Sequence, residues 1–150
     1  MQNLRQLKNK EKKSLIKKLE EQYGVKELKL NYLFFKNNEG RIFIINKEFR
    51  NLDLENINVN SIGLYFCRIE KELRLSVEGS QIIGPFAKKN VLEINEGQTK
   101  EWLQGNDIEV LNKDIEETFV ILKNKKDFIG SGKFKDGKIL NYVPKERRIK

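Results

Sequence analysis

Histidine is absent from this chain of 150 residues, and cysteine occurs only once, as Cys67. The lack of histidine excludes Ser-His-Asp triads, histidine general bases and histidine-ligated metal sites. A single cysteine excludes an internal disulfide and a multi-cysteine zinc site. Because Cys67 follows Phe66 in an apolar run, we expect a buried, reduced thiol there. The sequence therefore predicts no metal site, and no motif in it marks a cofactor.

Long apolar runs are missing as well. No stretch approaches the roughly 18 apolar residues that a membrane span requires. No apolar signal-peptide core follows the basic N-terminus. We therefore expect a cytoplasmic protein without a membrane partner. Hydrophobic residues still make up 38% of the chain, which is enough for a modest core.

Charge is plentiful and unevenly distributed. Lysine and arginine number 30 against 22 aspartate and glutamate residues, a net charge of +8. The net charge is +6 in residues 1–18, −4 in residues 88–122 and +7 in residues 123–150. Positive ends of this kind are typical of a surface that binds polyanions. For the N-terminal run, from Lys8 to Lys18, a solvated lysine-rich face is the simpler interpretation.

The first half of the chain shows alternating helix and strand patterns. Asn9 is the candidate N-cap of a helix over residues 10–23, which Gly24 would end. The remaining elements we predict, in chain order, are a β-hairpin over 29–45 with its turn at 37–40, a loop with a helical turn or two over 46–60, strands at 61–69 and 73–77, and a short helix over 78–83 ended by Gly84-Pro85. The sequence predicts a small α+β unit over residues 1–84.

The pattern restarts after Pro85 with short strands. The elements we predict there are strands at 91–94, 118–122, 128–134 and 139–143, a short helix over 97–104, and a tight turn at 135–138. Gly130 and Gly132 interrupt the third of these strands, which suggests a bend or a close approach of another backbone. Several short strands with one helix predict a small, strongly curved sheet or barrel over residues 85–150.

The sequence contains no complete catalytic motif. The run Gly130-Ser131-Gly132-Lys133 looks like a phosphate loop, but Asp127 stands where the motif needs glycine and Phe134 where it needs Ser or Thr. Adjacent acidic pairs such as Glu20-Glu21 point to different sides of a helix or strand. No nucleophile or general acid–base arrangement is visible, so we expect a protein that is not an enzyme.

The C-terminal segment combines basic residues with glycine and aromatic residues. Lysine and arginine would neutralise phosphates, glycines would let the backbone approach a nucleic acid, and Asn141 and Tyr142 would hydrogen-bond or stack on a base. The candidate binding residues are Gly130, Gly132, Lys133, Lys135, Lys138, Asn141, Tyr142, Lys145, Arg147 and Arg148.

The order of residues in FIGSGKFKDGKILNYVPKERR resembles the PUA-like RNA-binding domain that ends the Nol/Nop/Sun family of rRNA cytosine-5 methyltransferases. The upstream segments GPFAKKNVLEI and KEWLQGNDIEV are also similar, so the resemblance covers residues 84–150. Residues 1–83 are similar to the unit that precedes this module in small stand-alone archaeal proteins of the group. The resemblance implies an α+β protein in which a small α/β unit (1–84) packs on a PUA-like β-barrel (85–150).

The chain departs from that family in one respect. It has neither the length for a Rossmann-like catalytic domain nor the catalytic cysteines, since Cys67 stands alone without a Pro-Cys motif. We therefore expect an RNA-binding part without the enzyme, acting in rRNA or tRNA modification, rRNA processing or ribosome biogenesis. Its expected partners are structured rRNA or tRNA and a separate modification enzyme or a pre-ribosomal particle.

Two alternatives stay open from the residues alone. A protein–protein adaptor in ribosome assembly would carry its basic surface incidentally and would expose a contiguous apolar patch. A small enzyme acting on RNA would need a catalytic arrangement that the sequence does not show.

Overall fold

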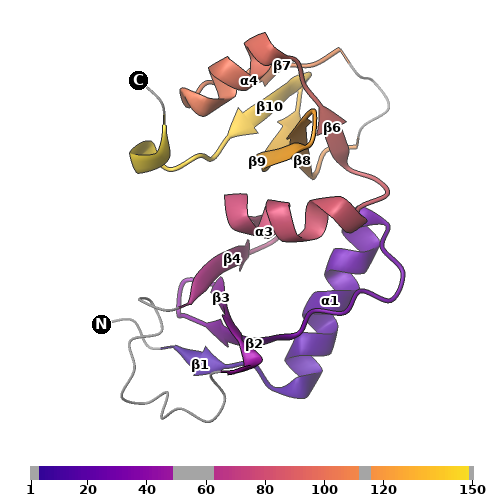
Figure 1. The fold of residues 1–150 in the computed structure, drawn as a ribbon, viewed down its shortest axis with the longest axis vertical. Helices are drawn as coiled ribbons and strands as arrows, with labels where there is room; N and C mark the ends of the chain where they lie inside the picture. Colours follow the sequence, from indigo (N-terminus) through magenta and orange to yellow (C-terminus); the bar gives the residue numbers. More distant parts are fainter. Residues whose placement is uncertain (1–3, 49–62, 112–115, 149–150) are drawn as a thin grey trace.

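The computed structural model describes residues 4–48, 63–111 and 116–148. Two five-stranded sheets and three α-helices make up this part of the chain, so the protein is of the mixed α+β class, as predicted (Figure 1). The predicted loop over residues 46–60 lies mostly outside the described residues. None of the described helices is both long and apolar enough to cross a membrane.

The first sheet is built from the N-terminal half. Its strands pair in the order β1-β2-β3-β4-β5, with all neighbours antiparallel. Their bounds are β1 Arg5–Gln6, β2 Tyr32–Lys36, β3 Arg41–Asn46, β4 Leu64–Ile69 and β5 Leu73–Leu75. The predicted hairpin at β2 and β3 is confirmed. Its turn is held by the Asn37 Oδ1 atom, which accepts hydrogen bonds from the backbone N–H groups of Glu39 and Arg41.

Helix α1 (Asn9–Tyr23) covers one face of this sheet. Its buried stripe of Leu15, Leu19 and Tyr23 packs on Ile42, Cys67 and other inward side chains, as the spacing predicts. Gly24 ends the helix in the left-handed conformation, with φ 66°. The prediction that Asn9 caps the helix is wrong, because Asn9 is the first helical residue and Lys8 precedes it. The Glu11 carboxylate accepts the backbone N–H of Lys8 instead.

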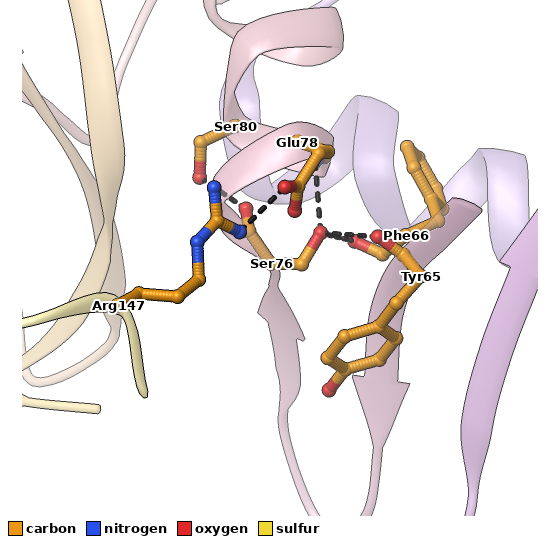
Figure 2. A network of polar contacts seen from close by, with 7 residues as sticks. Tyr65, Phe66, Ser76, Glu78, Ser80 and Arg147 are labelled. Atoms are coloured by element: carbon orange, nitrogen blue, oxygen red, sulfur yellow. Dashed lines mark hydrogen bonds and ion pairs between the residues drawn. The ribbon is translucent and has the colours of Figure 1, made fainter. Parts of the chain in front are cut away.

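Helix α3 (Val77–Ile83) follows β5 directly and continues into the 3₁₀ turn η2 (Gly84–Phe86). We predicted a strand to residue 77, which is wrong. Ser76 ends the extended chain because its hydroxyl donates to the Tyr65 and Phe66 carbonyls and accepts the N–H of Gly79 (Figure 2). A side chain that accepts in this way is a helix N-cap, so the chain turns into α3 at Val77.

The second sheet is built from the C-terminal half, in the order β6-β8-β9-β10-β7. The bounds are β6 Val91–Glu93, β7 Ile108–Glu109, β8 Phe119–Asn124, β9 Asp127–Lys135 and β10 Lys138–Asn141, with helix α4 (Glu96–Leu103) between β6 and β7 and the 3₁₀ turn η3 (Lys145–Arg147) after β10. Strand β6 runs parallel to β8, and the other pairs are antiparallel. The end strands β6 and β7 do not pair with each other among the described residues, so the sheet curls without closing.

Strand β9 runs through both glycines, but its register against β8 is irregular beside Gly130, where Leu122 pairs with Gly130 and Lys123 with Phe128. The predicted bend and close backbone approach at the glycines are therefore found. A Cβ atom at Gly132 would lie 2.5 Å from Cη2 of Trp102 and 2.6 Å from the Leu140 carbonyl oxygen. The glycine therefore makes room for the fully buried Trp102 of α4. The turn after β9 has the predicted hairpin chemistry, with Asp136 at φ 53° and Gly137 at φ 76°.

The two sheets pack on each other through α3, which lies between them (Figure 1). The hydroxyl of Ser131 on β9 donates to the Leu75 carbonyl on β5 at 2.6 Å, and both groups are buried. The side chain of Ile121 on β8 belongs to the core that α1 and the first sheet form. Trp102 marks a second core beneath α4. The predicted boundary at residue 84 falls between the two sheets, and the division into two domains stays a prediction.

Candidate nucleic-acid interface between the two sheets

Two adjoining cavities lie where the outer face of the first sheet meets the second sheet. The larger measures about 430 Å³ and the smaller about 280 Å³. Both are lined by residues from the two halves of the chain, and both include Arg74 and Tyr142. We call them together the inter-sheet groove. Six cationic and three acidic side chains line it, namely Arg41, Arg68, Lys71, Arg74, Lys133 and Arg147 against Glu70, Glu72 and Glu78.

The shared wall of the two cavities is a cation–π contact. The guanidinium carbon of Arg74 lies 4.5 Å from the centroid of the Tyr142 ring. That ring also packs against Phe119 on β8, with the two centroids 5.4 Å apart. Tyr142 nevertheless remains 42% exposed, which is unusual for a large ring with two such contacts. Part of its surface is therefore accessible to a ligand in the groove.

Two ion pairs join the halves across the groove. Lys133 on β9 lies 2.9 Å from a carboxylate oxygen of Glu72 in the turn between β4 and β5. The hydrogen bond from Lys133 to Glu72 raises the pKa of the lysine, so its ammonium stays charged at neutral pH. Arg147 in η3 reaches Glu78 on α3, as Figure 2 shows. Exposed pairs of this kind contribute little stability, which leaves both cations able to exchange the carboxylate for another anion.

Four of the ten predicted residues meet in the groove, namely Gly130, Lys133, Tyr142 and Arg147. Chain segments on β9, after β10 and in η3 bring them together. Lys133 and Tyr142 line the larger cavity, and Gly130, Tyr142 and Arg147 line the smaller one. These four residues therefore lie close enough together to contact one ligand.

The remaining predicted residues do not line these two cavities. Lys135 and Lys138 pair at the exposed β9–β10 turn, and Lys145 is exposed in η3. The Arg148 Nε donates to the Val143 carbonyl at 3.0 Å. Their contact with RNA stays a prediction.

Asn141 and Gly132 have packing and hydrogen-bonding roles in the second sheet. The side-chain amide of Asn141 donates to the carbonyls of Trp102 and Asn106, at 2.8 and 2.9 Å. Its Oδ1 atom accepts the N–H of Val143 at 2.7 Å. Gly132 is buried beneath Trp102. Because their groups are already engaged inside the protein, the interface we describe does not depend on either residue.

Sequence reasoning missed the N-terminal side of the groove. The cationic and aromatic residues on that side are Arg41, Tyr65, Arg68, Lys71 and Arg74. In the sequence, Arg74 alternates with the apolar Leu73 and Leu75, which places its side chain on the outer face of β5. This alternation shows which face of the strand Arg74 lies on, but it does not show what packs against that face. Only the packing of the second sheet against this face turns it into one side of a groove.

Residues 89–149 match the family model described as the methyltransferase RsmF PUA domain. The match covers the second sheet, α4 and η3, and it includes Lys133, Tyr142 and Arg147 of the groove. This part of the chain is therefore similar to a PUA domain. No curated protein sequence matches the chain.

Proposed function

We propose that this protein is a non-catalytic RNA-binding protein that holds structured rRNA or tRNA during RNA modification or ribosome biogenesis. The observation that carries the proposal is the inter-sheet groove, in which cationic side chains surround exposed tyrosine surface. Cations bind phosphates without regard to sequence, and aromatic rings stack on unpaired bases. The match of residues 89–149 to a PUA domain of a methyltransferase supports RNA as the polyanion. A separate modification enzyme would then act on the RNA that the groove holds.

The adaptor alternative draws no support from the exposed apolar residues. The large ones among the described residues are few, namely Leu64 on β4, Phe86 in η2, Leu111 after β7 and Tyr142 after β10. An adaptor surface requires such residues to adjoin one another. One of the four, Tyr142, is already part of the groove.

The test is a titration of fluorescently labelled transfer RNA at several salt concentrations. Each phosphate that the protein neutralises adds roughly 0.7–0.9 to the slope of log affinity against log salt. Replacing Lys71, Lys133 and Arg147 with glutamine should flatten that slope by roughly 2 and weaken binding at least tenfold. The matched control replaces the exposed Lys17, Lys100 and Lys126, which lie outside the groove, and should bind nearly as the parent does.

Glu72→Gln tests the same groove with the opposite sign. This change removes the carboxylate that competes with phosphate for Lys133, so RNA binding should become stronger by about threefold to tenfold. Equal binding by the parent and the triple groove variant would contradict the proposal, as would affinity that does not depend on salt.

A further inference from the structure

Three arginines stand side by side on the outer face of the first sheet. Arg41 on β3 pairs directly with Arg68 on β4, and Arg68 pairs directly with Arg74 on β5. Directly paired residues of antiparallel strands place their side chains on the same face. The neighbouring residues Ile42, Cys67 and Leu75 point to the opposite face, into the core beneath α1. We call Arg41, Arg68 and Arg74 the arginine row.

The arginine row is unfavourable for the folded protein by itself. Like charges directly opposite each other on neighbouring strands repel, and here two such pairs follow in succession. The carboxylates nearby compensate only in part. Glu70 lies 2.7 Å from Arg68, and Glu39 lies 3.8 Å from Arg41, beyond hydrogen-bond distance. No ion pair of Arg74 is found among the described residues.

Two atoms of the row lack a hydrogen-bond partner. The Nε atoms of Arg41 and Arg68 are both buried, and neither donates to any described group. A buried donor without an acceptor costs free energy, because it gives up water and receives nothing in exchange. Because these two Nε atoms are buried, an anion in the groove would meet the outer nitrogens of the guanidinium groups, which carry their remaining donors.

Aromatic rings border the row at both ends. The guanidinium carbon of Arg41 lies 5.8 Å from the centroid of the Tyr65 ring, and that of Arg74 lies 4.5 Å from the centroid of the Tyr142 ring. Contact with a ring face restricts the motion of a guanidinium group and leaves its edge free to donate hydrogen bonds. The rings also offer surface beside the row on which a base can stack.

We propose that Arg41, Arg68 and Arg74 together bind one phosphate group of an unpaired RNA strand, with the adjoining base against Tyr142. This inference rests on the proposed function and names the phosphate subsite within its groove. Arg68 lines the larger cavity, Arg41 the smaller and Arg74 both. Strands in a sheet lie about 4.8 Å apart, so these long side chains can reach one anion where the two cavities adjoin. The cavities around the row are of the size that small ligands fill, which suits a single unstacked nucleotide better than a duplex.

The first experiment follows the side-chain Nε–H signals of arginine by NMR, at constant ionic strength, on addition of inorganic phosphate or of hexauridylate. The signals of Arg41 and Arg68 should shift strongly on addition of either probe. The matched control is Arg5, whose guanidinium lies outside the groove and donates to Glu11 at 2.8 Å. A uniform response of all arginines, or none at saturating hexauridylate, would overturn the proposal.

The second experiment measures hexauridylate binding by a variant in which all three arginines become glutamine. Loss of one shared phosphate should lower affinity by about tenfold and flatten the salt slope by only about 0.7, the value for one contact to a single strand. A slope change near 2 would show three separate phosphate contacts and would overturn the single subsite. The melting temperature should stay equal or rise, because the like charges are gone.

Further binding measurements identify which kind of RNA phosphate occupies the subsite. Hexauridylate with and without a 5′-phosphate distinguishes a terminal phosphate from an internal one, and either preference supports the subsite. Tighter binding of a blunt RNA duplex than of the single strand would overturn the assignment to an unpaired nucleotide. If the parent protein binds neither transfer RNA nor hexauridylate, the proposed function fails. The response of the Arg41 and Arg68 signals to inorganic phosphate still decides the subsite.

Discussion

At the scale of single residues, Gly132 and Asn141 were predicted to contact RNA, but in the structure they pack and hydrogen-bond within the second sheet. Both belong to the segment whose order of residues resembles an RNA-binding module. In the structure, Gly132 makes room for Trp102, and Asn141 joins the ends of α4 and β10 by three hydrogen bonds. A resemblance in residue order can therefore reflect the needs of the fold as much as those of the ligand.

The packing role of Gly132 predicts a large loss of stability in Gly132→Ala. The new Cβ atom would lie 2.5–2.6 Å from Trp102, Ile139 and the Leu140 carbonyl, so the sheet or the indole must shift. Overpacking of this kind costs about 1–3 kcal/mol, measured by urea unfolding.

Gly97→Ala is the matched control for that substitution. A Cβ atom at Gly97, in the first turn of α4, would meet only the Asn95 Oδ1 atom, at 3.4 Å. Alanine is the better helix former, so this variant should gain a few tenths to about 1 kcal/mol. Equal effects at both positions would contradict the packing role of Gly132.

At the scale of secondary-structure elements, β1 and α1 are joined by a single ion pair. Both terminal nitrogens of Arg5 donate to the Glu11 carboxylate at 2.8 Å, and the backbone N–H of Lys8 donates to it as well. The hydrogen bonds from Arg5 and then from Lys8 lower the pKa of Glu11 to about 2. One carboxylate thus holds the edge strand and the start of the helix together.

The lowered pKa of Glu11 predicts a dependence of stability on pH. A group whose pKa is lower in the folded protein stabilises it above the unfolded value, near 4.5, and loses that effect as the pH falls toward 2. Glu11→Gln should therefore melt at a lower temperature than the parent at pH 6, with the difference vanishing near pH 2. Glu21→Gln, on the exposed side of α1, is the control and should show no such convergence. A difference that stays constant with pH would contradict the assignment.

At the scale of the whole molecule, the inter-sheet groove exists because the sheets from the two halves of the chain both pack on α3. A Cβ atom at Gly79 would lie 2.1 Å from the Phe66 carbonyl oxygen, so α3 approaches β4 as closely as glycine allows. The other side of α3 contacts β9. This arrangement fixes the distance between the arginine row and Tyr142, and with it the width of the groove.

The proposed non-catalytic role predicts that the purified chain transfers no methyl group. Labelled S-adenosylmethionine and ribosomal RNA should yield no labelled RNA above background, since no nucleophilic cysteine stands in the groove and Cys67 is fully buried in the core. Burial also raises the pKa of that thiol, which keeps it protonated and unreactive. An active cytosine-5 methyltransferase in a parallel reaction confirms that donor and RNA are competent. Transfer by the chain alone that survives Cys67→Ser would contradict the proposal.

The sequence by itself determined much of the local structure. The stripe of Leu15, Leu19 and Tyr23 with Gly24 after it, the turn at Asn37–Gly40 and the Asp136-Gly137 turn follow from local periodicity and backbone preference, and each was predicted. The similarity of the second half to a PUA domain was also predicted, from the order of residues in FIGSGKFKDGKILNYVPKERR, and the family match over residues 89–149 supports it. The short strands β1 and β7 were missed, because a strand of two residues is too short to show the alternation of buried and exposed side chains.

Only the tertiary structure decided which charged residues face one another. The sequence placed the binding site in residues 130–148, where the basic residues are dense. The groove takes only part of that segment and adds Arg41, Arg68 and Arg74, which are far apart in the chain and adjacent in the sheet. Strand register and the packing of α3 bring them together, and both depend on contacts between distant residues that no local pattern encodes.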